Sequence, residues 1–275
     1  MSVQRSARSS ADPAAVTLLI PHFQTLAAIR LCLRAVRRFS EPLPRVLLLD
    51  NGSTDAALDY LHGLKWIECV HTGIANDLAS AQAGALNLGA ARVETPYFAI
   101  MHSDTYVHRA GWLAALIAVL ERGGYAAVGS RHQTVRARDS RLFATVAAWT
   151  APLLPYVSPR ATSAGAAWLR SCLTLYRTRA FRAAGCRFAS DGEEDATHAA
   201  HAALAARGER LLALPDRFLG YYIFHKGDTT RIANGLYSAE DADFRARIAR
   251  HREHLRRFHS RRIVQDLLSD PTLDH

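Results

Sequence analysis

The sequence is poor in the features that mark secreted and membrane-spanning proteins. It has only four cysteines, and no two of them form a CxxC pair: Cys32, Cys69, Cys172 and Cys186. Such scattered cysteines argue against a disulfide framework or a cysteine zinc site, and they are typical of reduced, mostly buried thiols in a cytosolic protein. The uncharged stretch Leu142–Val157 contains two prolines and is too short to span a bilayer, so we expect a buried or interfacial segment there.

The start of the chain also lacks an apolar core. Residues 1–15 are mostly small, polar or charged, which excludes a secretory signal peptide and predicts a disordered lead-in. Beyond it, no internal repeat or low-complexity linker divides the chain. We therefore expect one sizeable domain, or one and a half, with enough chain to bury a core.

Acidic residues are outnumbered by basic ones. The sequence has 34 Lys and Arg against 25 Asp and Glu, a formal net charge of +9. This balance predicts an anionic partner, such as nucleotide phosphates or an acidic membrane surface. Much of the excess is local, because the stretch Phe244–Arg262 holds eight arginines against the single acid Glu253. No nucleic-acid-binding module is recognisable, so we expect no nucleic-acid partner.

Apolar runs and helical periodicities alternate along the first half of the chain, an order that predicts a largely parallel α/β sheet with helices on both faces. The expected strands are Val16–Ile20, Arg45–Leu49, Trp66–His71, Tyr97–Met101 and Tyr125–Ser130. The expected helices between them are Leu26–Phe39, Ala56–Leu64, Ala79–Arg92 and Trp112–Glu121.

The second half of the chain is less regular. Residues Arg136–Ser163 have no clear period. After them we expect a returning strand at Ala166–Tyr176, a short helix at Ala180–Ala184 and a helix opened by acidic residues at Asp191–Ala206. Two further strands, Arg210–Leu214 and Tyr221–Phe224, and a basic helical end, Ala239–Leu268, complete the order.

Two of the expected strands end at an aspartate. Asp50 follows one of them and Asp104 follows another within the polar turn His102–Thr105. Parallel strands present their carboxyl ends at one edge of the sheet, which is where open α/β sheets bind ligands. A carboxylate beside a diphosphate is repulsive unless a divalent cation lies between them, and Mg²⁺ or Mn²⁺ suits that role.

Several segments resemble family 2 glycosyltransferases, which have the GT-A fold. The matching stretches are VTLLIPHF, VLLLDNGSTD, ALNLGAARVETPYFAIMHSDTYV, GEEDATHAAHAALAARGERL and YIFHKGDTT. The GSTD that follows an apolar strand and an aspartate is the most specific of them, and N-x-G in the helix before the SDT strand supports it. Together the resemblance covers roughly Val16–Thr230.

The resemblance implies a mixed, mostly parallel sheet of GT-A type flanked by helices. Residues 16–235 would form the glycosyltransferase domain, with a nucleotide-sugar half at 16–131 and an acceptor half at 132–235. Residues 236–275 would be a basic helical extension. The implied enzyme is a cytoplasmic hexosyl or related transferase that moves a sugar from a nucleotide-diphosphate sugar to an acceptor hydroxyl, with inversion. Its acceptor would be a glycan, a lipid-linked molecule or a small molecule.

The family's site residues carry over to positions of this sequence. Asp195, or its neighbour Glu194, would be the general base that takes the proton of the acceptor hydroxyl. The metal site would contain Asp104, His102 and His225, holding Mn²⁺ or Mg²⁺. The nucleotide-sugar site would contain Pro21, His22, Phe23, Asp50, Asn51, Asn87, Ser103, Asp104, Lys226 and Thr229.

One position departs from the family pattern, because the usual DxD motif reads HSD here. A neutral imidazole at His102 can bind Mn²⁺, but the loss of one negative charge also weakens a cation site, so metal dependence stays open. The departure leaves a second hypothesis, a degenerate relative that binds a nucleotide or glycan without turnover. A nucleotidyltransferase is a third, although Pro21–Gln24 is not the glycine-rich phosphate loop that it needs.

The same residues also have structural interpretations. Asp50 could cap the following helix, Glu193–Asp195 could complement a helix dipole, and His225 could be a hydrogen-bonded histidine at a strand end. Trp149 and Trp168 could line an acceptor pocket, although core aromatics are favoured. The basic C-terminal helix could contact an acidic membrane at its inner face or pack on the domain with a solvated arginine face.

Overall fold

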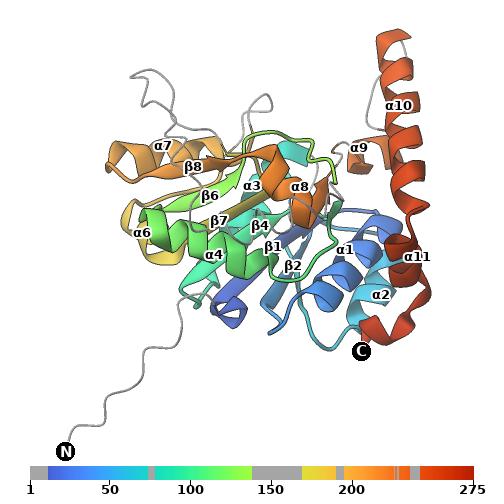
Figure 1. Cartoon of the computed structure of the whole chain (residues 1–275), viewed down its shortest axis with the longest axis horizontal. Helices are drawn as coiled ribbons and strands as arrows, with labels where there is room; N and C mark the ends of the chain where they lie inside the picture. Colours follow the sequence, from blue (N-terminus) through green and yellow to red (C-terminus); the bar gives the residue numbers. More distant parts are fainter. Residues whose placement is uncertain are drawn as a thin grey trace, which may run out of the picture.

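A seven-stranded sheet forms the centre of the computed structural model (Figure 1). The structure describes residues 12–73, 78–137, 169–189, 195–225, 227, 229–235 and 242–275. From one edge to the other, the strands are β3 (Glu68–His71), β2 (Arg45–Asp50), β1 (Val16–His22), β4 (Tyr97–Met101), β7 (Leu173–Arg177), β6 (Ala127–Ser130) and β8 (Leu211–Leu214).

The sheet is mixed and mostly parallel, which confirms the expected fold class. Strand β1 runs parallel to β2 and β4, β2 runs parallel to β3, and β6 runs parallel to β8. Only β7 is antiparallel to its neighbours β4 and β6. The carboxyl ends of β1 to β4 therefore meet at one edge, as the alternating pattern of strands and helices predicts.

Helices cover both faces of the sheet. Alternate strand residues point to opposite sides, so Leu18 and Ile20 belong to one apolar cluster and Leu19 to the other. The first cluster is covered by α1 (Leu26–Phe39), α2 (Ala57–Gly63) and α4 (Trp112–Gly123). The second is covered by α3 (Leu78–Ala91), α6 (Thr178–Ala183) and α7 (His198–Ala206).

The N-x-G pair of α3 has a packing explanation. Gly89 faces the sheet, where an added Cβ would lie 2.9 Å from Leu49 Cδ1 and 3.1 Å from Leu19 Cδ2, so a side chain there would push the helix away. Asn87 donates to the carbonyl of Phe188 (2.8 Å) and accepts from its amide (2.9 Å). Both residues therefore fix how α3 sits on the sheet.

A small second sheet pairs β5 (Thr105–Val107) with β9 (Ile223–His225) in antiparallel register. The sequence patterns did not reveal β5, and the expected strand Tyr221–Phe224 is wrong in its first half. Tyr221 and Tyr222 belong to helix α8 (Asp216–Tyr222), which starts directly after Pro215. Burial of Phe218 and Leu219 stabilises that helix against the β-propensity of the tyrosines.

The end of the chain, after β9, adds helices α9 (Thr229–Ala233), α10 (Ala242–His259) and α11 (Arg262–Ser269) and the turn η2 (Pro271–Asp274). Near the start, Pro13–Ala15 form one 3-10 turn, while residues 1–11 of the predicted lead-in lie outside the described residues. So do Leu142–Val157, Trp149 and Trp168. Within the described residues, no helix combines the length and the hydropathy that a bilayer span requires.

Candidate active site

The polar turn between β4 and β5 holds His102 and Asp104 in place. The Thr105 amide donates to the His102 carbonyl (3.0 Å), which closes a tight turn. The Thr105 hydroxyl and the His102 amide both donate to the carbonyl of Cys172, just before β7, at 2.9 and 3.3 Å. The turn is therefore tied to the antiparallel strand beside it, and Asp104 is only 6% exposed.

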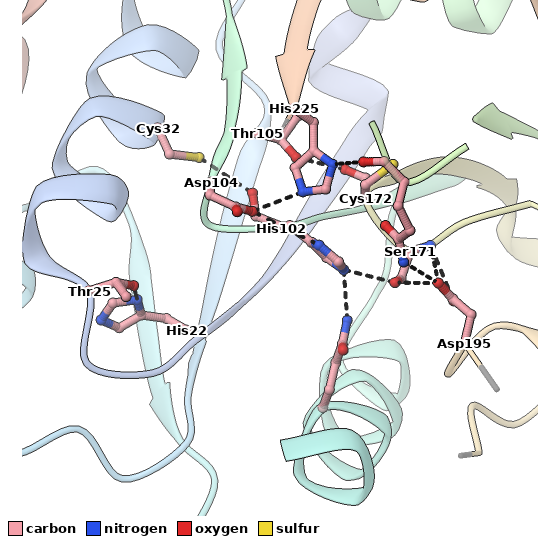
Figure 2. A network of polar contacts seen from close by, with 12 residues as sticks. His22, Thr25, Cys32, His102, Asp104, Thr105, Ser171, Cys172, Asp195 and His225 are labelled. Carbon is pink, nitrogen blue, oxygen red and sulfur yellow. Dashed lines mark hydrogen bonds and ion pairs between the residues drawn. The ribbon is translucent and has the colours of Figure 1, made fainter. Parts of the chain in front are cut away.

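Strand β9 brings His225 to the same carboxylate from 121 positions further along the chain. Nε2 of His225 lies 3.0 Å from Oδ1 of Asp104, and Nδ1 of His102 lies 4.0 Å from that oxygen. One ligand atom from each of the three residues lies within 4.8 Å of the others. Figure 2 shows both imidazole rings beside the carboxylate, so the structure brings together the three residues predicted to bind metal.

Hydrogen bonds orient each imidazole. Nδ1 of His225 donates to the Gln133 carbonyl, which leaves Nε2 as the nitrogen that faces Asp104. Nε2 of His102 lies 2.8 Å from the Ser171 hydroxyl, which donates to Asp195, and 2.9 Å from the side-chain amide nitrogen of Gln82. Partners of this kind orient metal-binding histidines in other proteins.

Burial and mutual charge set the protonation of the group. Burial alone would raise the pKa of Asp104, but the charge and hydrogen bond of His225 outweigh it and hold that pKa below its usual range. Burial would likewise lower the pKa of His225, and the Asp104 carboxylate raises it well above 6.5 instead. Burial, followed by the charge of His225, lowers the pKa of His102 to about 4.

Asp195 joins this group through Ser171. Its carboxylate accepts from the amide and hydroxyl of Ser171 (3.2 and 3.0 Å), the amide and hydroxyl of Thr197 (3.1 and 2.8 Å) and the side-chain amide of Gln133 (2.9 Å). Helix α7 begins at His198, so Asp195 precedes the helix instead of opening it. Figure 2 shows the chain of contacts from His102 through Ser171 to Asp195.

A second polar group lies where β1, β2 and β3 end. His22 pairs with Asp50, and Asp50 pairs with His71, in the registers of the parallel strands. Oδ2 of Asp50 accepts from the amides of Gly52 (3.3 Å) and Ser53 (3.2 Å) and lies 3.4 Å from Nδ1 of His71. Gly52 has φ 82°, which lets the chain turn back over the carboxylate.

Two atoms of this second group have no hydrogen-bond partner among the described residues. They are Oδ1 of Asp50 and Nε2 of His22, on side chains that are 1% and 2% exposed. Burial lowers the pKa of His22 to about 4, so its imidazole is neutral near pH 7. A buried, unpaired polar atom is costly, and such atoms persist in native proteins mainly where a ligand or water completes them.

The remaining predicted nucleotide-sugar residues are less uniform. Pro21 pairs with Leu49 beside His22, and Asn51 accepts from the Thr72 hydroxyl (2.8 Å). Phe23 is half-buried directly after β1, and Ser103 is buried in the turn between His102 and Asp104.

The Thr229 hydroxyl, at the start of α9, is a buried polar group without a hydrogen-bond partner among the described residues. Asn87, by contrast, uses its amide on Phe188 and is not among the residues that the structure brings to Asp104. Glu194 and Lys226 lie outside the described residues.

Three residues of the site were missed in the sequence. His71 ends a strand at the same edge as Asp50, and the rule that selected Asp50 would have found it. Ser171 and Gln133 carry no sequence signal, because they lie in irregular segments and act through contacts with residues 24 to 92 positions away. Only the folded chain places them between the two acids.

Comparison with known proteins bears on the fold and the family. Residues 17–182 match the family model described as glycosyl transferase family 2, which is more than half of the chain. No curated protein sequence matches.

Solved structures show the same fold at low sequence identity. The mannosyltransferase PcManGT from Pyrobaculum calidifontis, in complex with GDP-Man and Mn²⁺, has a TM-score of 0.52 at 17% identity, covering 75% of this chain and 57% of that one. TarS residues 1–349 from S. aureus, in complex with UDP-GlcNAc, have a TM-score of 0.55 at 13% identity, covering 81% and 61%. The chain thus spans about three fifths of the length of these structures.

Proposed function

The chain belongs to glycosyl transferase family 2, and from this we propose that it transfers a sugar from a nucleotide-diphosphate sugar to an acceptor hydroxyl, with inversion at the anomeric carbon. The observation that carries the proposal is the meeting of His102, Asp104 and His225 beside Asp195, at the edge where β1 and β2 leave Asp50 and His22 with unpaired atoms. That edge is where open α/β sheets bind nucleotides.

The donor's nucleoside would contact Asp50 and His22. The free oxygen of Asp50 accepts hydrogen bonds from a base or a ribose hydroxyl, and the neutral imidazole of His22 offers one further polar contact. Pro21, Phe23 and Asn51 border the same strand ends and complete the proposed pocket wall. The diphosphate would then reach towards Ser103 and Asp104, with Lys226 and Thr229 as further phosphate contacts.

The residues at Asp104 fit a divalent metal ion. Two imidazole nitrogens and one carboxylate oxygen suit Mn²⁺ better than Mg²⁺, which prefers oxygen ligands throughout. Nε2 of His225 faces the Asp104 carboxylate and would release its proton when the metal binds. When bound, the ion would neutralise charge on the leaving diphosphate. His102, Asp104 and His225 would hold it, while Gln133 and Ser171 keep the two rings oriented.

Asp195 would act as the general base, with Glu194 as its neighbour in the motif. Its carboxylate already accepts from the Gln133 amide, the amide and hydroxyl of Ser171 and the Thr197 amide, which is about its full capacity. The Thr197 hydroxyl is shared between Asp195 and the Leu169 carbonyl (2.8 and 2.6 Å). An acceptor hydroxyl must therefore displace one donor, and the flexible side chain of Gln133 is the one most readily moved. The proton would then pass to Asp195 as the acceptor oxygen attacks the anomeric carbon, whose bond to the diphosphate oxygen breaks and releases the nucleoside diphosphate.

The same saturation favours a second candidate, a protein that binds a nucleotide sugar without turnover. If Gln133 and Ser171 never release Asp195, the site holds a donor but has no free base. The two candidates differ in product formation and agree in donor binding, so one experiment separates them.

The acceptor would approach from the side of Asp195.

Helix α10 carries exposed arginines, among them Arg250, Arg252 and Arg256, and stands at the side of the molecule in Figure 1. We extend the proposal to a cytoplasmic enzyme whose basic helix contacts an anionic membrane surface that presents the acceptor. Co-sedimentation with anionic but not neutral lipid vesicles, lost at high salt, is the expected result; equal binding to both would contradict it.

The central test measures donor binding by thermal shift and turnover by release of nucleoside diphosphate. The panel begins with uridine and guanosine donors, because the two solved structures hold UDP-GlcNAc and GDP-Man. Each is tested with Mn²⁺, Mg²⁺ or EDTA. We expect one nucleotide to raise the melting temperature with Mn²⁺ most strongly, because a ligand bound only to the folded state stabilises it by mass action.

Two variants make this test specific. Asp104→Ala should lose the metal-dependent shift, while Asp216→Ala, which removes an exposed carboxylate that contacts only His132 in the described structure (3.0 Å), should keep it. A shift without turnover in the wild type would favour the binding protein. Absence of a shift with every nucleotide would contradict the donor site.

A further inference from the structure

The strand pair β5–β9, next to which the proposed metal ligands lie, is too small to be stable by itself. Strands β5 and β9 have three residues each and pair only with one another as strands, apart from a bridge of His225 to Val135. Isolated two-stranded pairs are marginally stable in water. Asp104 lies directly before β5 and His225 ends β9, so other elements must fix the distance between the two side chains.

An aromatic stack covers the back of this pair. Tyr106 and Phe224 are partners in the β5–β9 register, one row from Thr105 and His225. The Phe258 ring at the end of α10 lies 4.0 Å from the Phe224 ring and 5.4 Å from the Tyr106 ring, nearly parallel to both (11° and 15°). Because neighbouring strand residues point to opposite faces, this stack lies on the face opposite His225.

The position of Phe258 depends on how the following segment is anchored. Arg34 of α1 binds Asp274 through Nε (2.9 Å) and Nη2 (2.5 Å), and its Nη1 donates to the carbonyls of Leu267 and Leu268 (3.1 and 2.7 Å). The Tyr60 hydroxyl of α2 adds a bond to Asp274 (2.8 Å). The Arg34 side chain is only 7% exposed, so this ion pair is largely shielded from water.

The anchor and the site share helix α1. α1 packs against β5, and its Cys32 lies 3.9 Å from the His102 carbonyl, while its Arg34 side chain holds the end of α11. Val264 and Leu267 of α11 are buried in the apolar cluster on the α1 side of the sheet. α1 thus connects the segment 258–274 to the turn that bears Asp104.

We propose that residues 258–274, here called the C-terminal brace, position Asp104 and His225 for metal binding. Phe258 packs on the face of the strand pair opposite His225, and the bonds from Arg34 and Tyr60 to Asp274 keep Phe258 in place. Phe258, Arg34 and Asp274 are positioning residues that do not themselves contact the metal or the donor. The inference rests on the proposed function for its metal, but the packing that it describes can be measured without one.

The first test compares Mn²⁺ affinity, measured by the loss of the free Mn²⁺ signal in electron paramagnetic resonance. Phe258→Ala and Asp274→Ala should each weaken Mn²⁺ binding, by about 10-fold or more, the size of effect seen when groups behind a metal ligand are removed. Phe258→Leu, which keeps an apolar side chain in the stack, should recover most of the affinity. Asp266→Ala removes a carboxylate of the brace that is 70% exposed and should bind as the wild type does.

The second test measures amide hydrogen exchange without metal. Faster exchange is expected in peptides that cover β5 and β9 in Phe258→Ala and Asp274→Ala, while peptides that cover β1 and β2 remain protected. If a variant unfolds, Tyr60→Phe removes a single bond to Asp274 and should give the same pattern more weakly.

The outcomes distinguish a failure of the brace from a failure of the proposed metal site. Unchanged exchange in β5 and β9, or exchange that rises equally across the whole sheet, would overturn the brace. Unchanged Mn²⁺ affinity in Phe258→Ala would also overturn it, because the ligands would then hold their positions unaided. A wild type that binds no Mn²⁺ would contradict the metal in the proposed function, and hydrogen exchange alone would then decide whether the brace exists.

Discussion

Two polar groups at one edge of the sheet differ in how completely the protein pairs their polar atoms. At the ends of β1 and β2, Asp50 and His22 are buried with one unpaired atom each. At the ends of β4 and β9, Asp104 and His225 pair with one another, and Asp195 accepts from four donor groups. The first group keeps two buried atoms that a ligand or water could complete, although Oδ2 of Asp50 is held by the Gly52 and Ser53 amides, whereas the second group is held by the protein's own contacts.

The difference indicates how each group should respond to change. An unpaired buried atom contributes little to the fold, so its removal costs ligand affinity more than stability. A group whose partners all come from the protein is preorganised, and a change in one partner reaches the others through the network. The following experiments test this contrast.

The largest effect is expected at Asp195. Asp195→Asn keeps the size of the side chain but removes the base, so turnover should fall by about 10²- to 10⁴-fold. Donor affinity should change less than threefold, since the proposed donor contacts lie elsewhere. Nucleoside diphosphate release and thermal shift measure the two quantities. Equal turnover in the variant would assign the base to another residue, with Glu194→Gln as the next variant to examine.

In the group at the ends of β1 and β2, Asp50→Ala should reduce nucleotide affinity by about 10- to 100-fold, which corresponds to the usual free energy of hydrogen bonds to a charged acceptor. The loss should be the same with Mn²⁺ and with EDTA, because Asp50 is not among the three residues that meet at the proposed metal site. Calorimetric titration with the nucleoside diphosphate measures it. A loss that appears only with metal would mean that the two groups act as one site.

A smaller effect is expected where the network orients a proposed metal ligand. Ser171→Ala removes one of the two side-chain groups that contact Nε2 of His102. Mn²⁺ affinity should fall by about tenfold, as for other groups that orient metal ligands. Thr174→Ala is the matched control, since that hydroxyl donates to the Arg170 carbonyl (2.9 Å) away from His102. Equal Mn²⁺ affinity in Ser171→Ala and wild type would mean that another group, such as Gln82, suffices to orient His102.

The smallest effect concerns stability and pH. His201 is buried beside Tyr176 (Nε2 to hydroxyl oxygen, 2.8 Å), and burial lowers its pKa to about 4 from 6.5. The unfolded chain therefore binds more protons between these values, and the free energy of unfolding should drop as the pH falls through that window. His201 should account for about 1 kcal/mol between pH 7 and pH 5.5. In urea unfolding experiments, the free energy of unfolding of His201→Gln should depend less steeply on pH than that of the wild type. An unchanged slope would mean that other groups cause the pH dependence.

Local patterns predicted the first half of the fold well. The apolar period of Leu26–Phe39 matches α1 at both ends, and Tyr97–Met101 matches β4. The acids at the ends of β2 and β4 were found for the same reason, because a strand that stops at a carboxylate is visible in a short window of sequence. The largely parallel sheet followed from the alternation of these elements, while its mixed character was expected only from the family resemblance.

Contacts between distant segments were harder to predict. Helix α8 was missed because its tyrosines favour a strand locally and only burial of its other face decides otherwise. The amide of Asn87 looked like a ligand contact but binds the Phe188 backbone, which the α3 sequence gives no way to foresee. The brace was also hidden, because the pairing of Arg34 with Asp274 joins residues 240 positions apart.

The sequence by itself determined the family, the strand ends and the candidate acids, because these depend on residues that are neighbours in the chain. Tertiary structure alone decided that His225 faces Asp104 across 121 positions and that Ser171 connects His102 to Asp195. A hydrogen bond constrains two atoms to about 3 Å, and no local preference can specify that distance between segments that meet only after the sheet has formed.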